Sequence, residues 1–297
     1  MKPFLQEIAD GVHAYVQPDG GWCLNNAGLL TSDGEAALVD TAATESRARA
    51  LREAALRVGP PPRVIVNTHS HGDHTFGNCV FPEAVVVGHA GTRTEMEQVG
   101  LHLTTLWPEV CWGHIEVAPP TLTYETEVML HVGTVRAEVR NMGTAHTVND
   151  SVVWLPGERV LFTGDLVMSG VTPFFPMGSL SGSLTAIRSL RDLAPRTVVT
   201  GHGPVAGPEV LDEAEAYLLW VDDVARAGHA DGLTPLELAT KTDVTPWRHL
   251  LDPERLVPNL HRAYAELDGA APGSPIDMTA LFHEMVTYRG SAPVCRA

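Results

Sequence analysis

The stretch VIVNTHSHGDHTFGN, Val64–Asn78, decides how this sequence can fold and what it can do. It opens with a β-branched apolar run, which predicts a buried strand. Three histidines and an aspartate follow directly, His69, His71, Asp73 and His74, in an H-x-H-x-D-H pattern. His69 and His71 are two residues apart, so on extended backbone their side chains point the same way and can hold one cation. Asp73 and His74 lie further along the turn and can serve a second cation.

Four side chains from one loop cannot complete two coordination shells, so further donors are expected at other strand ends. The candidates are Asp40 after AALV, His146 before SVVWLP, Asp165 after RVLFTG and His202 after RTVVTG. A single histidine or aspartate of this kind is usually a core residue or a turn former. The whole set would require repeated coincidence. Nitrogen and oxygen donors without thiolate suit zinc, and would also accept iron or manganese.

Strand-like and helix-like patterns alternate up to about residue 205, and only helical patterns follow. A β meander is expected over Thr121–Thr163, and a last helix is expected to open at Ser274-Pro275 with Asp277 in its first turn. We therefore predict an α/β fold with two sheets packed between helical layers, as residues 1–205, and a helical C-terminal region, residues 206–297, packed on that core.

The composition of the 297 residues limits the classes of function. A formal charge of −16 disfavours binding to nucleic acid. No apolar run approaches the roughly 20 residues of a membrane span. The opening MKPFLQEIADGV lacks a basic segment followed by an apolar one, and the four cysteines form no CxxC pair. We expect a cytoplasmic protein with reduced thiols and no membrane partner.

The order H-x-H-x-D-H, distant His, TGD and GHG resembles the metallo-β-lactamase-fold superfamily over roughly residues 10–205. The resemblance implies an αββα sandwich with two Zn²⁺ ions, or other divalent metals, at one edge. His69, His71 and His146 then match the ligands of one metal, and Asp73, His74 and His202 those of the other. Asp165 matches the bridging carboxylate and Asp40 an acid that orients a ligand. Asp73 and Asp165 would be the catalytic carboxylates.

Five further segments, GGWCLNNAG (20–28), LTTLWPEVCWG (103–113), VMSGVTPF (167–174), GHGPVAGPEV (201–210) and ERLVPNLHRAYAEL (254–267), resemble aromatic polyketide second-ring cyclases of the actinorhodin type. This resemblance implies metal-assisted aldol closure of a later ring in a partly cyclised poly-β-ketone. The substrate would be free or bound to an acyl carrier protein, and hydrolysis of that thioester would be a second activity. Either Asp165 or a hydroxide held by the metals could transfer protons.

The pocket walls are predicted from aromatic and methionine side chains in loops near the donors. The candidate substrate-binding residues are Trp22, Trp107, Trp112, Phe174, Phe175 and Met177. Flat aromatic walls suit a planar product, although tryptophan and phenylalanine are more often core residues.

Two other functions compete with the cyclase. A glyoxalase II-like thioesterase would act on a small acyl thioester, but residues 206–297 contain only seven Lys or Arg, in no visible cluster for glutathione. An interaction module with structural metals is disfavoured, because structural zinc sites usually use thiolates. The helical tail could cover the pocket or form a homodimer contact.

Overall fold

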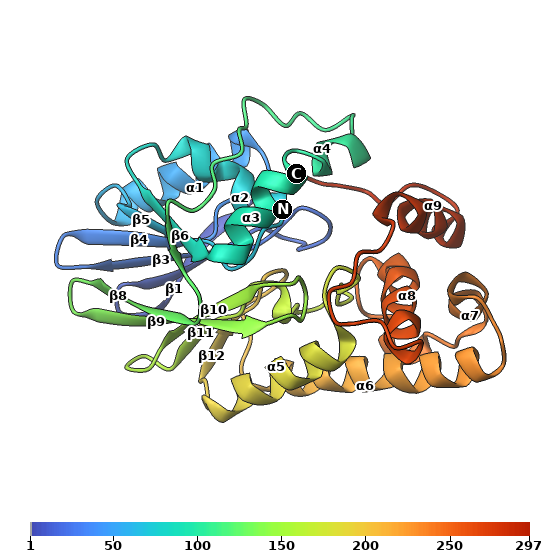
Figure 1. Cartoon of the computed structure of the whole chain (residues 1–297). Helices are drawn as coiled ribbons and strands as arrows, with labels where there is room; N and C mark the ends of the chain where they lie inside the picture. Colours follow the sequence, from blue (N-terminus) through green and yellow to red (C-terminus); the bar gives the residue numbers. More distant parts are fainter. Residues whose placement is uncertain (1) are drawn as a thin grey trace.

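Two β-sheets lie face to face between layers of helices, as Figure 1 shows for the computed structural model, which describes residues 2–297. Within that range the first sheet has the strand order β1 (Phe4–Ala9), β2 (Val12–Val16), β3 (Ala27–Ser32), β4 (Glu35–Val39), β5 (Val64–Val66), β6 (Val85–His89), β7 (Leu122–Tyr124). The second has the order β12 (Thr197–Val199), β11 (Val160–Phe162), β10 (Asp150–Leu155), β9 (Val135–Gly143), β8 (Glu127–Val132). The αββα class predicted from the sequence is confirmed.

The strands from β8 to β11 form the expected antiparallel meander, and β12 then pairs with β11 in parallel. The start of the predicted meander is wrong, because β7 belongs to the first sheet and runs parallel to β6. Alternating apolar residues are compatible with either neighbour, so the pattern of TLTY alone could not assign its sheet.

Side-chain alternation on the strands builds two cores from one sequence pattern. On β10, Val153 and Leu155 pack between the sheets, whereas Val152 and Trp154 face the helices on the other side. The sheets approach each other closely at Gly28, where a Cβ atom would lie 2.5 Å from the Phe162 ring. Glycine is therefore required there for the two sheets to pack at this distance.

The helices cover both outer faces. Their bounds are α1 (Glu45–Val58), α2 (Gly72–Thr75), α3 (Ala90–Val99), α4 (Leu103–Leu106), α5 (Leu180–Asp192), α6 (Glu209–Ala230), α7 (Pro235–Lys241), α8 (Leu256–Leu267) and α9 (Met278–Arg289), with short 3-10 turns at Phe76–Val80, Gly164–Leu166, Thr245–Trp247 and Pro253–Arg255. Helix α1 begins after Thr44, whose side chain accepts the Arg47 N–H. Its buried alanine and leucine face packs on the first sheet, and α5 and α6 pack on the second.

The helical C-terminal region extends from α6 to α9, and α8 packs against both α6 and α9. Helix α9 does not open at Ser274-Pro275 as predicted. It begins at Met278, and Asp277 is its N-cap, accepting the N–H groups of Thr279 and Ala280. Among the helices of residues 2–297, none has the length and apolar character that a membrane span requires.

Candidate metal centre

One edge of the sandwich collects the ends of strands from both sheets. Strands β4 and β5 are parallel, so Asp40 and the loop after Val66 leave the first sheet at the same edge. In the second sheet the parallel strands β11 and β12 end before Asp165 and His202. Strand β10 is antiparallel to β11, which brings the segment before it, with His146, to that same edge. Donors separated by long stretches of sequence therefore meet.

The first donor group contains His69, His71, His146 and Asp165, whose candidate ligand atoms all lie within 4.8 Å of one another. His71 Nδ1 is 2.9 Å from His146 Nε2. His146 Nε2 is 3.4 Å from Asp165 Oδ2, and His69 Nε2 is 4.0 Å from the same oxygen. These separations suit three nitrogens and one carboxylate oxygen arranged around a single ion.

The second group contains Asp73, His74 and His202, again with ligand atoms within 4.8 Å of one another. His202 Nε2 is 3.3 Å from Asp73 Oδ2. Asp165 joins the two groups, since its Oδ1 lies 3.0 Å from His74 Nε2 and its Oδ2 lies 3.4 Å from His202 Nε2. A carboxylate between two donor groups is positioned to bridge two cations.

Two of the donor histidines are held by a backbone carbonyl at their second ring nitrogen. His146 Nδ1 donates to the Phe174 carbonyl, and His202 Nδ1 donates to the Gly20 carbonyl at 2.9 Å. A carbonyl oxygen can only accept, so these imidazoles carry a proton on Nδ1 and leave Nε2 facing the site. The arrangement fixes the tautomer that a metal ligand needs.

Asp40 orients the early histidine loop. Its carboxylate accepts from His74 Nδ1 at 2.8 Å, from the Thr68 N–H at 2.8 Å and from the Thr68 hydroxyl at 2.7 Å. The Thr68 oxygen lies 2.9 Å from His69 Nδ1, so one buried aspartate positions two histidines. Its backbone is left-handed, with φ 60°, an unusual conformation for a residue other than glycine.

Three buried polar atoms of this cluster make no well-aligned hydrogen bond among the described residues: His69 Nε2, and the pair His74 Nε2 and Asp165 Oδ1, which lie 3.0 Å apart. Unsatisfied buried groups are costly, and here all three belong to the donor set. Burial, with His74 and His71 as charged neighbours, holds the pKa of His69 well below its usual value. Burial likewise lowers the pKa of His146 to about 3. Neutral imidazoles with unshared lone pairs fit a divalent cation.

The neighbouring histidines favour the charged form of Asp165. Burial alone would raise the pKa of Asp165, but the neighbouring His202, His74 and His146 outweigh it and hold the value well below the usual range. Burial opposes a charge on His202 too, but Asp165 and Asp73 raise its pKa to about 9. The close approach of Gly201 permits this packing, since a Cβ atom there would lie 2.0 Å from Asp165 Oδ1.

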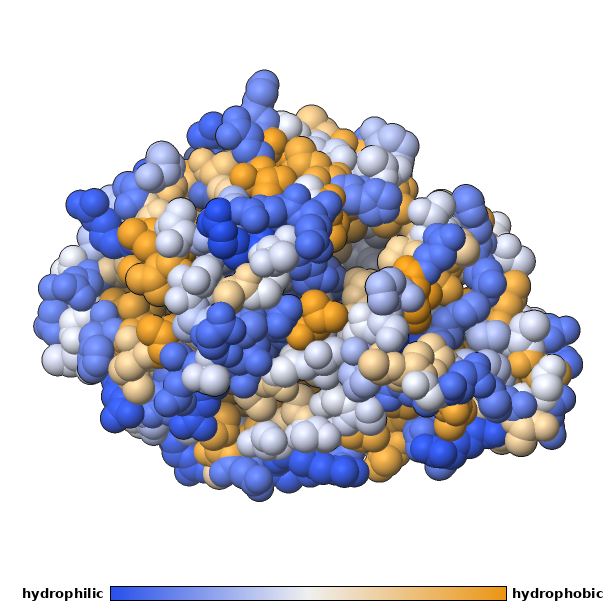
Figure 2. All heavy atoms as spheres, in the orientation of Figure 1, coloured by the Kyte–Doolittle hydropathy of each residue, from blue (hydrophilic) through white to orange (hydrophobic). Residues whose placement is uncertain are grey.

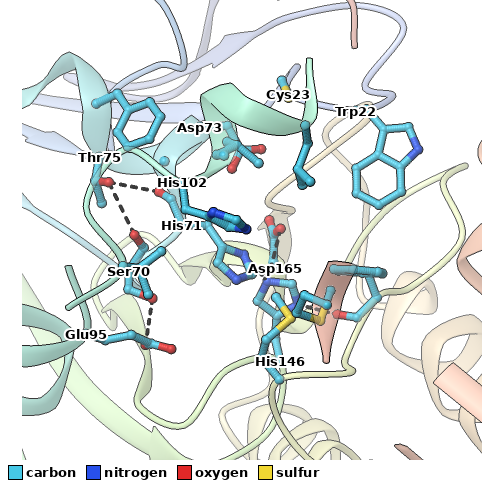
Figure 3. A pocket seen from close by; sticks show the side chains of 18 of the residues that line it. Trp22, Cys23, Ser70, His71, Asp73, Thr75, Glu95, His102, His146 and Asp165 are labelled. Atoms are coloured by element: carbon cyan, nitrogen blue, oxygen red, sulfur yellow. Dashed lines mark hydrogen bonds and ion pairs between the residues drawn. The ribbon is translucent and has the colours of Figure 1, made fainter. Parts of the chain in front are cut away.

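A cavity of about 240 Å³ opens over the two donor groups. Figure 2 shows the surface hollowed between the part that carries α3 and α4 and the helices α8 and α9. The close view in Figure 3 places His71, His146 and Asp165 beside one another, with Trp22 across from Ser70 and Glu95. Most of the wall is apolar, and five of the chain's eight methionines contribute to it: Met96, Met168, Met177, Met278 and Met285.

The predicted wall residues fall into two sets. Trp22, Trp107, Phe174 and Met177 line the cavity, but Trp112 and Phe175 do not. Trp112 packs against Phe76 and donates its Nε1–H to the Trp107 carbonyl at 3.1 Å. Phe175 lies in the core between the second sheet and its helices. The structure therefore offers no contact between these last two side chains and a bound ligand.

Several cavity residues were not anticipated from the sequence. Helix α9 contributes Met278, Phe282 and Met285, and α3 contributes Glu95. Arg255 is buried, stacks 4.0 Å from the Trp22 ring centre and pairs with Asp252 at 3.0 Å. Ser70 lies inside the histidine motif, which was a usable signal, but nothing in the local sequence distinguishes the others from ordinary helix residues.

Comparisons with known proteins agree with this geometry. The family model described as the metallo-beta-lactamase superfamily matches residues 20–202. The Beta-lactamase-like protein 2 homolog of Caenorhabditis elegans is 32% identical over 73 residues, which cover 25% of this chain and 24% of that protein. The alignment therefore spans only about a quarter of this curated relative.

Solved structures show the same fold. The DIM-1 metallo-beta-lactamase superposes with a TM-score of 0.60 at 18% identity, covering 74% of this chain and 98% of that one. A metallo-beta-lactamase from Pontibacter korlensis gives a TM-score of 0.59 at 22% identity, covering 73% and 99% of the two chains. At these identities the likeness concerns the fold alone.

Proposed function

The chain belongs to the metallo-beta-lactamase superfamily, and from this premise we propose that it is a dinuclear zinc-dependent cyclase of aromatic polyketide biosynthesis. It would close a later ring of a partly cyclised poly-β-ketone by aldol condensation. The observation that carries the proposal is the position of two donor groups, joined by Asp165, at the floor of an apolar cavity with aromatic walls. Other divalent metals would fit the same donors.

The segments that resemble second-ring cyclases support the proposal, because all five reach the cavity wall. They contribute, in order along the chain, Trp22, Trp107, Phe174, His202 and Arg255. These segments lie far apart in sequence, and the cavity wall brings a residue of each together. A planar, partly aromatic substrate would find flat apolar surfaces there, with the polar groups gathered at the metal end.

In the proposed cyclase, some residues of this chain would hold the metals and others would contact the substrate. His69, His71 and His146 would hold one cation, Asp73, His74 and His202 the other, and Asp165 would bridge them. When bound, two such cations supply Lewis acidity, which polarises carbonyl oxygens and makes water or a neighbouring C–H bond more acidic. Trp22 is fixed for contact with a flat substrate, since its Nε1–H donates to Glu254 at 2.9 Å and its ring lies against Arg255.

The alternative is a glyoxalase II-like thioesterase that acts on a small acyl thioester. An anionic thioester such as one of glutathione calls for free cationic side chains at the cavity. Among the described residues Arg255 is the single Lys or Arg on the wall, and Asp252 already pairs with it. This charge pattern favours a neutral, apolar substrate, either free or carried as a thioester by an acyl carrier protein.

The test adds the purified protein to a reconstituted minimal aromatic polyketide synthase with its early tailoring enzymes. We expect a changed ring pattern in the product, lost with His71→Ala and retained with His131→Ala, an exposed histidine on β8. If only simple acyl thioesters are hydrolysed and no aromatic product changes, the thioesterase alternative replaces the cyclase.

A further inference from the structure

Aldol closure needs a base for a C–H bond, and three carboxylates line the cavity: Asp73, Asp165 and Glu95. The first two face imidazole nitrogens at 3.0 to 3.4 Å and belong to the donor groups. Their oxygens are directed at the metal positions, so a bound cation would occupy the lone pairs that a base needs. Glu95 is the cavity carboxylate outside either group.

Glu95 lies on α3, beside Met96 and Val99 of the same wall, and is half-buried. Its Oε2 accepts a hydrogen bond from the Ser70 hydroxyl at 2.6 Å. Ser70 lies between His69 and His71 in the chain, so this bond ties the carboxylate to the loop that carries the first donor group. In Figure 3 the bond runs along one side of the cavity, next to His71.

No cation neutralises this carboxylate. Within residues 2–297, no Lys, Arg or His nitrogen is found within 4.0 Å of Glu95, although the nearby Glu97 pairs with Arg93 at 2.6 Å. A carboxylate on an apolar wall with a single hydroxyl partner keeps one oxygen available to a ligand. The backbone of its partner Ser70 is held in place, because the Thr75 hydroxyl is shared between the carbonyls of Ser70 at 3.3 Å and His71 at 2.9 Å.

We propose that Glu95 is the general base of the ring closure, a role that rests on the proposed cyclase function. Glu95 removes the proton from a carbon between two carbonyl groups of the bound chain. The C–H electron pair enters the enolate, whose carbon forms the new C–C bond to a second carbonyl carbon. The π electrons of that carbonyl move to its oxygen, which then receives the proton back from Glu95. One proton leaves and returns, so the step needs no further reactant.

Glu95→Gln separates the chemistry from the structural bond, because the amide oxygen can still accept from Ser70. We expect ring closure in the reconstituted system to slow by about 100-fold or more, in the range for loss of a general base. Zinc content and thermal midpoint should stay at the wild-type values. Glu95→Asp, which keeps a carboxylate, should recover part of the rate. Glu97→Gln, on the same helix and exposed, is the matched control and should react like the wild type.

Two further variants exclude the competing explanations. Ser70→Ala removes the hydrogen bond to Glu95 but keeps the carboxylate, so it should slow ring closure less than Glu95→Gln does. His102→Asn tests the one cavity histidine of the described residues outside the donor groups, an exposed side chain at the start of α4, and should also slow ring closure less than Glu95→Gln. The proposal is overturned if Glu95→Gln cyclises at the wild-type rate, if it loses zinc, or if His102→Asn is the more damaging change. A wild-type protein without cyclase activity would instead refute the proposed function itself.

Discussion

The floor and the cover of the cavity are built in opposite ways. At the floor, strand ends from both sheets carry the polar donor side chains. The atoms of these side chains that face away from the site also make hydrogen bonds, as His74 Nδ1 does with Asp40 at 2.8 Å. The cover, formed by α4, α9 and the loops near Trp22, relies mainly on apolar packing, for example between the Trp107 and Phe282 rings at 5.6 Å, with single hydrogen bonds from the Trp22 and Trp107 indoles. Hydrogen bonds fix direction, whereas apolar contacts fix little beyond volume.

This difference implies a division between chemistry and selection. A change at the floor should alter metal binding and therefore every reaction of the site. A change in the cover should alter which molecule fits while the metals stay. The predictions below test that division, beginning with the largest effect.

Asp165→Asn should be the most damaging substitution, because it removes a charge from both donor groups at once. Since loss of an outer-shell partner alone typically costs 10–100-fold, we expect activity to fall by more than about 100-fold. Metal analysis should show less than two zinc ions per chain. A variant that retains two zinc ions and full activity would contradict a bridging role.

Metal removal should destabilise the whole chain. Zinc at about a hundred times its dissociation constant would contribute about 2.7 kcal/mol, which corresponds to a loss of at least about 5 °C in thermal midpoint after chelation. The loss should be reversed by added zinc. Thermal scans with and without a chelator measure it, and an unchanged midpoint would mean that the donors hold no metal.

The metal-free protein should also lose stability as the pH rises from about 6.5 to 9. The pKa of His202 is raised to about 9 in the folded chain, mainly by Asp165 against the effect of burial. Its favourable charge pairing is present below the unfolded value and is lost as the pH passes the folded one. Histidines with lowered pKa values, such as His146, add stability mainly as the pH rises towards the unfolded value near 6.5, so their opposing contribution above it is small. Denaturant titrations of the metal-free protein at pH 6.5 and 9 would measure this loss of stability.

Asp40→Asn tests the support of the floor rather than a ligand. The amide can still accept from Thr68 but offers no charge to His74, so zinc affinity should fall by about 10–100-fold. The midpoint of a zinc titration gives the value. A matched substitution, Asp33→Asn in the exposed turn between β3 and β4, should leave it unchanged.

Phe282→Ala tests the cover. The ring lines the cavity and packs on Trp107, so its loss should raise KM for a bulky aromatic substrate by about tenfold, equivalent to about 1.4 kcal/mol. Zinc content should remain two per chain. A fall in zinc content would show that floor and cover are not separable.

Trp112→Phe should have the smallest effect. The substitution retains packing on Phe76 and removes one hydrogen bond to the Trp107 carbonyl. We expect about 1 kcal/mol less stability and an unaltered KM. A changed KM would place this side chain in contact with substrate, contrary to its position in the structure.

The parts of the molecule that the sequence predicts well are those with local rules. Strand ends follow from β-branched runs, and the H-x-H-x-D-H spacing brings its own donors together; the residues expected to form the floor, from Asp40 to His202, lie close together in the structure. The cover was less predictable. Trp107 and Trp112 lie in one loop of similar composition, and only tertiary packing decides that the first faces the cavity.

Two other differences have the same physical origin. Strand β7 could join either sheet because its alternation fits both, and its pairing with β6 depends on the path of the preceding loop. Helix α9 was expected four residues too early, because Pro275 is a good first-turn residue but Asp277 caps the backbone N–H groups in the structure. The carboxylate of Glu95 was missed because helical spacing alone does not indicate a ligand.

The methionine-rich wall has a consequence for how such a chain could diversify. Methionine is unbranched and polarisable, so it adapts its shape to a neighbour more readily than leucine or isoleucine. A wall of this kind can accept substrates of several shapes. Substitutions among the twelve residues of α9 can then narrow the range of substrates that bind. Duplicated genes could in this way diverge in substrate while both copies keep the donor residues of the floor.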